Sequence, residues 1–228
     1  MRLQVFLSKS GVCSRRSAVD IIRSGKARVN NRKILEPSFN IDTAKDIVFL
    51  NDKKISLKEE IYIMLNKPRG VTTTKKDRFA KRTVMDLLPP RMSHLNPVGR
   101  LDKDTTGLLL LTNNGDLINR LTHPRYNIEK LYEARLDARL KDADRAALER
   151  GIDLDGERTA PCRIQLREKS NLEIVLHEGK KRQIRRMFSK MGYKVLDLKR
   201  SKEGSLALAG LGEGRWRALT EKELRELS

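Results

Sequence analysis

The sequence has few cysteines, few aromatic residues and no long hydrophobic run. Its two cysteines, Cys13 and Cys162, form no CxxC pair, which argues against a zinc ribbon or a disulfide scaffold and indicates a reducing compartment. No window approaches the ~18 uninterrupted apolar residues of a membrane span, and the first residues lack the apolar stretch of a signal peptide. These absences predict a cytoplasmic protein. One Trp, four Tyr and five Phe are too few for general single-strand binding by stacking on many rings.

Several motifs of cofactor, metal and hydrolase chemistry are also missing. The sequence contains no GxxxxGK[ST] phosphate loop, no glycine-rich turn for a dinucleotide or methyl donor, and no HExxH or GxSxG motif. The three histidines, His94, His123 and His177, show no metal-ligand spacing. We therefore predict no cofactor and no bound metal.

The positive charge of the chain is large and concentrated. There are 49 Lys and Arg against 30 Asp and Glu, a net charge of +19. Residues 9–33, 67–82 and 180–202 each contain at least seven basic residues and a single acidic one. A single charge run is usually a solvated face, but three runs in so basic a chain indicate a polyanionic partner, with RNA or DNA first among the candidates.

The first sixty residues read as a small separate unit. Ser14 can cap a helix whose apolar positions Ala18, Ile21 and Ile22 share one face, and Gly25 can end it. A hairpin signal follows, with its turn at residues 30–31. The stretch RLQVFLSKSGVCSRRSAVDIIRSGKARVNNRKI resembles the S4 RNA-binding domain over residues 1–50. The polar connector 51–60 marks the expected boundary, so we predict an S4-like domain with its linker over residues 1–60.

The remaining residues, 61–228, predict an α+β domain. Strand patterns alternate irregularly with helical ones, which favours a mixed or antiparallel sheet with flanking helices over regular βαβ units. Strands are expected at residues 61–66, 108–112, 132–136, 162–167, 171–177, 194–198 and 206–208, and helices at 83–88, 115–121, 142–151, 180–191 and 220–227.

One segment of this second domain carries candidate chemistry. Asp102 and Asp104 lie in a polar loop that leads into a strand of four leucines. Aspartate, threonine and glycine are ordinary turn residues, so the loop alone indicates no more than a turn. A catalytic carboxylate would need a nearby cation to favour its ionised form. Arg185 lies at the margin of the apolar stripe of the helix expected at 180–191, where its guanidinium can reach a cleft.

The segment GRLDKDTTGLLLLTNNGDLINRLTHPRYNIEKLYEARL resembles the catalytic motif of RNA pseudouridine synthases, and more narrowly the RsuA/RluB/RluE/RluF family, which joins an S4 domain to a catalytic domain. LNKPRGVTTT, TVMDLLP, HEGKKRQIRRM and GRWRALTEKEL match in the same order. Asn114, Leu131 and the loop KKDRFAK at residues 75–81 depart from the common pattern. These departures bear on substrate choice, since none of them removes a catalytic position.

This resemblance implies the site residues and the substrate. Asp102 is the implied catalytic aspartate, Tyr132 the active-site tyrosine and Arg185 the basic partner of the aspartate. The implied reaction converts a flipped-out uridine of ribosomal RNA to pseudouridine without cofactor or metal. Either a covalent or a glycal route is compatible with the sequence. The basic residues expected to contact RNA are Arg15, Arg16, Arg23, Lys26, Arg28 and Arg32 in the first unit and Lys67, Arg69, Arg100, Lys181, Arg182 and Arg186 in the second.

The identity of the RNA is the least specified part of this prediction. We expect large-subunit (23S) rather than small-subunit (16S) ribosomal RNA, a structured pre-ribosomal intermediate as the partner, and a monomeric enzyme. One alternative is an S4-type ribosomal RNA-binding protein without catalysis, although binding alone needs no carboxylate in a basic cleft. Another RNA-modifying enzyme, such as a methyltransferase, would require the glycine-rich donor site that the sequence lacks.

Overall fold

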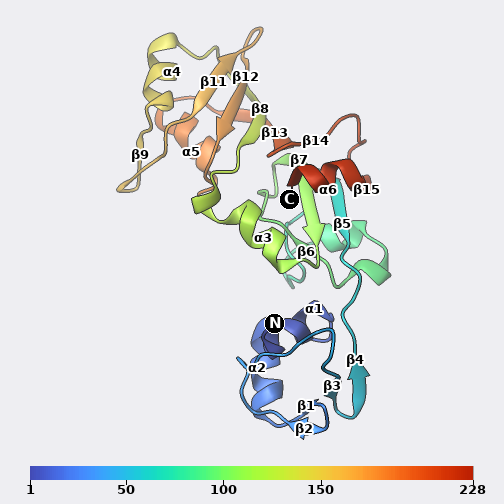
Figure 1. Cartoon of the computed structure of the whole chain (residues 1–228). Helices are drawn as coiled ribbons and strands as arrows, with labels where there is room; N and C mark the ends of the chain where they lie inside the picture. Colours follow the sequence, from blue (N-terminus) through green and yellow to red (C-terminus); the bar gives the residue numbers. More distant parts are fainter. Residues whose placement is uncertain (228) are drawn as a thin grey trace. The chain divides into compact units, whose positions relative to one another are not determined.

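The computed structural model describes residues 1–227, which divide into two compact units (Figure 1). One consists of Met1–Ile61 with Asn113–Gly115, and the other of Tyr62–Thr112 with residues 116–227. The predicted boundary at residue 60 remains a prediction, since three residues from the middle of the chain group with the first unit. No helix among the described residues is long and apolar enough to cross a membrane.

The first unit packs two helices against a small sheet. Helix α1 (Leu3–Lys9) and α2 (Arg15–Arg23) precede a four-stranded sheet in the order β2-β1-β3-β4, formed by Ala27–Val29 (β1), Arg32–Lys33 (β2), Val48–Leu50 (β3) and Lys53–Ile55 (β4). The predicted cap of α2 is confirmed, because the Ser14 hydroxyl accepts a hydrogen bond from the Ser17 amide at 3.1 Å.

The hairpin of the first unit is also confirmed. Asn30 and Asn31 both have positive φ angles, of 48° and 66°, as a two-residue turn between twisted strands requires. Asparagine tolerates this left-handed conformation better than most residues do. The unit closes around one apolar core whose members are Leu3, Phe6, Leu7, Ala18, Ile22, Ala27, Val29, Ile34, Ile41 and Val48.

The second unit is built on one mixed sheet, as predicted. Its strand order is β11-β12-β8-β13-β7-β5-β15, with β14 added beside β13 and β6 beside β7. All pairs are antiparallel except β13 with β7, which run parallel and join the two halves of the sheet. The strands are Tyr62–Lys67 (β5), Asn96–Pro97 (β6), Thr106–Thr112 (β7), Lys130–Leu136 (β8), Arg163–Leu166 (β11), Asn171–Leu176 (β12), Val195–Glu203 (β13), Leu206–Ala207 (β14) and Trp216–Ala218 (β15).

Helices flank each half of this sheet. In Figure 1, α3 (Gly115–Thr122) and α6 (Glu221–Leu227) lie beside β7 and β5, while α4 (Asp142–Glu149) and α5 (Gln183–Lys190) lie beside the β8–β12–β11 half. Leu121 and Leu227 of the first two helices share a buried cluster with Leu108 and Leu110 of β7. Leu109 and Leu111, which point to the other face of β7, are buried as well. Both faces of the strand are covered, which explains its uninterrupted run of leucines. The short elements are β9 (Asp153–Leu154), β10 (Glu157–Arg158) and the 3₁₀ turns Val84–Leu87, Pro90–Met92 and Pro124–Tyr126.

Two predicted helices differ from the structure. The segment expected as a helix at 83–88 is a 3₁₀ turn that Thr83 and Asp86 cap reciprocally. The helix expected from residue 180 begins at Gln183, because Arg182 adopts a left-handed conformation with φ of 50°. Lys180, Lys181 and Arg182 consequently form a loop ahead of α5.

Candidate active site

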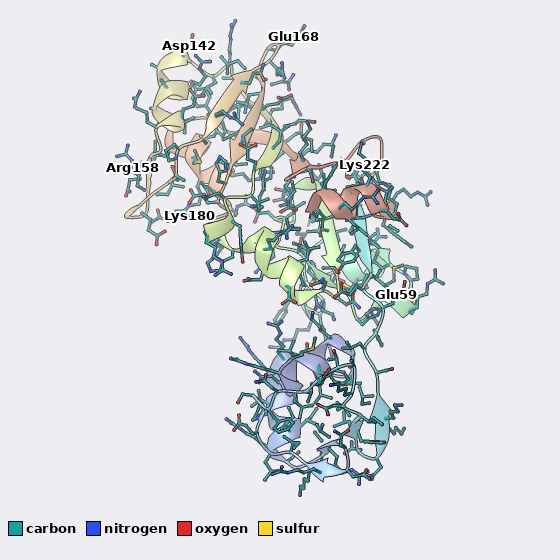
Figure 2. All side chains as sticks on the ribbon, viewed as in Figure 1. Glu59, Asp142, Arg158, Glu168, Lys180 and Lys222 are labelled. Carbon is teal, nitrogen blue, oxygen red and sulfur yellow. The ribbon has the colours of Figure 1, made fainter. Side chains whose placement is uncertain are left out.

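A pocket of about 540 Å³ opens in the second unit. Asp102 and Arg100 reach it from the loop before β7, Tyr132 from β8, and Lys181 and Arg182 from the loop before α5. Lys180, labelled in Figure 2, belongs to the same lining. The fold thus brings together residues that are 82 positions apart in the sequence, from Arg100 to Arg182, including two of the three predicted catalytic residues.

Asp102 is the unbound carboxylate of this pocket. Within residues 1–227, its carboxylate accepts no hydrogen bond and forms no ion pair, and only its backbone carbonyl is engaged, by the Thr105 amide at 3.0 Å. The other lining carboxylate, Glu178, accepts from the Ala160 amide at 2.9 Å and from Gln183 Nε2 at 2.6 Å. A half-buried carboxylate with free lone pairs can attack a substrate atom or accept a proton.

The backbone around Asp102 is held by the segment that follows β5. Lys67 Nζ donates to the carbonyls of Pro68, Lys103 and Thr105 at 2.9, 3.3 and 2.8 Å. The Gly70 amide donates to the Lys103 carbonyl at 2.9 Å. Two of these carbonyl groups follow Asp102 closely in the chain, so the lysine fixes the loop that carries the carboxylate.

The prediction that Lys67 contacts RNA is wrong. Its side chain has no exposed surface, and all three of its protons are donated to backbone carbonyls. Burial lowers the pKa of its amine to about 8, although the charges of Asp104 and Asp102 oppose that shift. In the sequence, its position beside Arg69 in a basic run concealed that it ends a buried strand.

Arg185 lies near the carboxylates without bonding either of them. Its guanidinium donates to the Val195 carbonyl at 2.7 Å and to the Asp104 carbonyl at 3.1 Å. Burial and the neighbouring Arg182 lower the pKa of Arg185, while Asp104 and Asp102 raise it. Arg185 and Asp102 therefore interact through their charges at a distance and do not form the direct ion pair that was predicted. Arg182 forms the ion pair with Asp104, at 3.7 Å.

Tyr132 rests on a buried ion pair that the sequence analysis did not find. Arg200 is its cross-strand partner, bonds the Leu108 carbonyl through Nε at 2.8 Å, and pairs with Glu203 at 3.1 Å. Burial raises the pKa of Tyr132, whereas the charge of Arg200 lowers it. Burial also raises the pKa of Glu203, against the charges of Arg200 and Lys130.

A register shift in β13 makes this pair possible. Residues three apart on a regular strand face opposite sides of the sheet. The pairing of β13 with β8 slips between Arg200 and Lys202, and one extra residue reverses the alternation. Both Arg200 and Glu203 consequently face the interior. No composition or spacing signal reveals such a slip, which is why both residues were missed.

The other predicted RNA-binding residues divide among three places. Arg100, Lys181 and Arg182 line the pocket of Asp102. Arg186 is close by on α5, in an ion pair with Asp155. Arg15, Arg16, Arg23, Lys26 and Arg32 are exposed on the first unit, and Arg28 there is paired with Asp52 at 2.5 Å.

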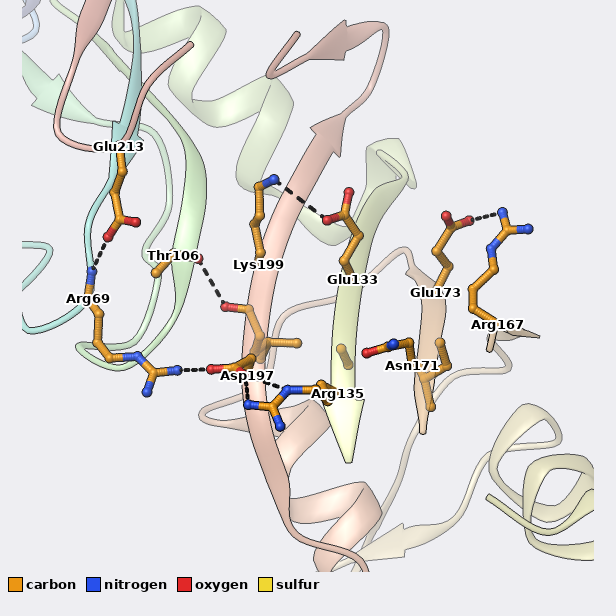
Figure 3. Close-up of a pocket in the computed structure, with 13 residues that line it drawn as sticks. Arg69, Thr106, Glu133, Arg135, Arg167, Asn171, Glu173, Asp197, Lys199 and Glu213 are labelled. Atoms are coloured by element: carbon orange, nitrogen blue, oxygen red, sulfur yellow. Dashed lines mark hydrogen bonds and ion pairs between the residues drawn. The ribbon is translucent and has the colours of Figure 1, made fainter. Parts of the chain in front are cut away.

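Arg69 belongs to a second groove, of about 670 Å³, which Figure 3 shows. Its guanidinium donates to Asp197 at 2.6 Å, and Arg135 bonds the same carboxylate. Lys199 pairs with Glu133 at 3.6 Å and Arg167 with Glu173 at 3.0 Å. The cations of this groove are paired with carboxylates of the same groove. The Asp102 pocket differs, because three exposed cations, Arg100, Lys181 and Arg182, form its rim.

Comparison with known proteins identifies relatives of both units. The RNA pseudouridylate synthase family model matches residues 61–190, and the S4 domain model matches residues 1–48. The ribosomal large subunit pseudouridine synthase B of Bacillus subtilis is 38% identical over 99% of this chain and 95% of its own length. The ribosomal small subunit pseudouridine synthase A of Haemophilus influenzae is 33% identical over 100% of this chain and 99% of its own.

A solved structure agrees with these relatives. A crystal structure of a pseudouridylate synthase superimposes with a TM-score of 0.74 at 32% identity, covering all of both chains.

Among residues 1–227, no group of three or more His, Cys, Asp or Glu side chains is arranged to hold a metal ion.

Proposed function

Because the chain belongs to the RNA pseudouridylate synthase family, and is thus an enzyme that isomerises uridine in RNA, we propose that Asp102 is its catalytic carboxylate and ribosomal RNA its substrate. The observation that carries this proposal is the free carboxylate of Asp102 in a pocket that also holds Tyr132 and a rim of cations. An RNA-binding surface alone has no use for an unpaired carboxylate in that place, since it would repel phosphate.

The reaction exchanges one glycosidic bond for another. The C1′–N1 bond breaks, the uracil turns, and C5 bonds to C1′; the C5 proton then leaves and N1 gains a proton, so that the atoms balance. Asp102 begins the reaction either by attacking C1′ or by removing the C2′ proton. Both routes require the ionised carboxylate.

We assign Tyr132 to the uracil base and the cations of the pocket rim to the RNA backbone. We assign to the Tyr132 ring the stacking of the uracil and to its hydroxyl a part in removing the C5 proton. A uridine inside a helix cannot reach the pocket, so it must flip out, at a cost of a few kcal/mol. Arg100, Lys181 and Arg182 can offset that cost by holding the flanking phosphates.

The substrate proposal rests on the relatives. Those compared are named for either ribosomal subunit, and we propose the large-subunit RNA because the relative with 38% identity is named for it. We further propose that residues 1–60 dock the RNA, that an assembly intermediate is the natural substrate, and that the enzyme acts as a monomer.

Tritium release tests this function. Transcripts of large- and small-subunit RNA labelled with tritium at C5 of uridine should release label to water without any added cofactor, and only the large-subunit RNA should do so efficiently. Chemical mapping of the product would locate the modified base. Efficient release only from small-subunit RNA would overturn the substrate assignment, and binding without release from either RNA or from pre-ribosomal particles would favour a non-catalytic binding protein.

A further inference from the structure

One exposed aromatic ring in the second unit has no role in the reaction described so far. Phe79 is 83% exposed, more than any other large hydrophobic residue in the described chain, the next being Leu35 at 57%. The ring stands in the loop of residues 74–82, where the other side chains include five cations, those of Lys75, Lys76, Arg78, Lys81 and Arg82. Exposure of so much apolar surface is unfavourable unless a partner covers it.

The base of this loop is bonded to the loop of Asp102. The Thr72 amide donates to the Arg82 carbonyl at 3.0 Å, which closes the neck of residues 74–82. Beside this neck, the Thr73 hydroxyl donates to the Leu101 carbonyl at 2.7 Å and accepts from the Leu101 amide at 3.3 Å. Because Leu101 immediately precedes Asp102, the loop and the carboxylate share one anchored stretch of backbone.

The tip of the loop presents the ring. The carboxylate of Asp77 accepts from the Phe79 amide at 2.9 Å, and its carbonyl accepts from the Ala80 amide at 3.3 Å. The turn is therefore held by the bonds of Asp77, and no contact with the ring is needed to form it. The guanidinium of Arg78 lies 4.7 Å from the ring centre, an arrangement that joins a cation to a stacking surface.

We propose that Phe79 stacks on an unpaired base of the RNA substrate beside the flipped uridine, while the exposed cations of the same loop contact the adjoining phosphates. The inference rests on the proposed function, because it assumes an RNA bound over Asp102. Every base has a face on which an aromatic ring can stack. The five cations of the loop favour a polyanion over an apolar protein surface, because such a surface would offer them no opposite charge.

This stack restricts the substrate. The base that Phe79 covers must lie outside a regular helix, so the preferred RNA has a loop, bulge or helix end next to its target uridine. A fully paired stem around the target would lack a free base for the ring and would be a poor substrate even if its uridine could flip.

Substitution of the ring tests the proposal. Phe79→Ala should raise the KM for the RNA about tenfold, the scale of one lost base stack, with little change in kcat. Phe79→Trp should restore the KM, whereas Phe79→Leu, which keeps apolar bulk without a ring face, should not. Tyr126→Leu is the matched control, because Tyr126 is also exposed and also lies under an arginine, with Arg125 at 4.5 Å; its KM should stay at the wild-type value.

Salt dependence separates the ring from the cations. Stacking releases no counterion, so Phe79→Ala should leave the slope of log K against log salt unchanged, while Lys76→Ala should lower that slope by about one. Equal KM values for the Leu and wild-type forms, or an unchanged KM for Phe79→Ala on naked RNA, would overturn the stack; the second result would point to a protein partner.

Fluorescence of the Phe79→Trp variant distinguishes this inference from the proposed function. Stacking on a base should quench the emission of the new indole when RNA binds, and the parent protein, with Trp216 as its single tryptophan, gives the background. Quenching by an RNA that is never isomerised would keep the stack and reject the activity on that RNA. Turnover without quenching would keep the proposed activity and reject the stack.

Discussion

The cations of the catalytic unit occupy two regions that differ in burial and in task. Lys67 and Arg200 lie beneath the site with 0% and 2% of their surface exposed. Lys67 donates to three backbone carbonyls, and Arg200 donates to the Leu108 carbonyl and forms an ion pair with Glu203. Arg100, Lys181 and Arg182 stand on the rim of the same pocket and are exposed. The net charge of +19 suggests a surface that binds polyanions, and this interpretation fits the exposed cations of the rim but not the buried ones. Under the proposed function, the buried cations hold the backbone around Asp102, and the exposed cations supply affinity for RNA.

The largest expected effect comes from breaking the buried pair. Arg200→Met removes the ion-pair partner of the buried Glu203, which should lower the free energy of unfolding by about 3–5 kcal/mol. The double variant Arg200→Met/Glu203→Leu should recover most of that loss, because apolar replacements of a buried pair are often neutral. Urea unfolding of both variants measures this. Equal destabilisation by the single and double variants would contradict the account.

The same double variant shows whether the pair also positions Tyr132. If Arg200 holds the tyrosine, the refolded double variant should bind RNA with the wild-type Kd but turn over more slowly, with a changed pH profile. If the pair is only structural, kcat and its pH dependence should return together with stability.

The second-largest effect is expected from Lys67→Met, which should slow turnover. The substitution leaves the carbonyls of Pro68, Lys103 and Thr105 without their donor, so the loop of Asp102 loosens. We expect a loss of kcat on the order of a hundredfold, as a displacement of about 1 Å can produce, and an RNA Kd within about twofold of wild type. An unchanged kcat would show that the lysine does not hold the catalytic geometry.

The pH dependence of stability identifies the charge of Lys67. Its pKa in the folded protein is about 8, below the usual value of about 10.4. Below about pH 8 both the folded and the unfolded states carry the proton, and the full cost of the buried charge is present. Between about pH 8 and pH 10.4 the unfolded state binds more protons, so stability due to Lys67 rises with pH. Urea titrations should show the gap between wild type and Lys67→Met widening over that range, and a constant gap would be contrary to this burial.

Substitution of the exposed rim cations should weaken RNA binding while leaving the stability of the fold almost unchanged. Arg182→Gln or Lys181→Gln removes an exposed cation, so the free energy of unfolding should change by less than about 0.5 kcal/mol. RNA affinity should fall, and the slope of log K against log salt should decrease by about one for each phosphate that the variant no longer neutralises. A drop in stability comparable with that of Lys67→Met would erase the distinction between rim and interior.

The contrast also explains what the sequence could predict. The Ser14 cap, the Asn30–Asn31 turn and the leucine strand β7 follow from local patterns, because their residues are chosen by backbone geometry and by burial. The meeting of Asp102 and Tyr132 in one pocket was expected only from the family resemblance, since no local pattern relates a loop before β7 to a position in β8.

The failures have physical causes of their own. Lys67 was read as a surface cation because a strand end and a basic run look alike when side-chain direction is unknown. Arg200 and Glu203 were hidden by the register slip in β13, which defeats any argument from alternation. The left-handed Arg182, which shortens α5, gives no signal in a sequence where glycine is the usual marker of that conformation.

The most direct test of the central claim is tritium release by Asp102→Asn beside Asp104→Asn. The two residues share one loop, but the Asp102 carboxylate is free whereas Asp104 pairs with Arg182. The account predicts no detectable turnover for Asp102→Asn with the RNA Kd within a few-fold of wild type, and substantial turnover for Asp104→Asn. Wild-type turnover by Asp102→Asn would contradict it.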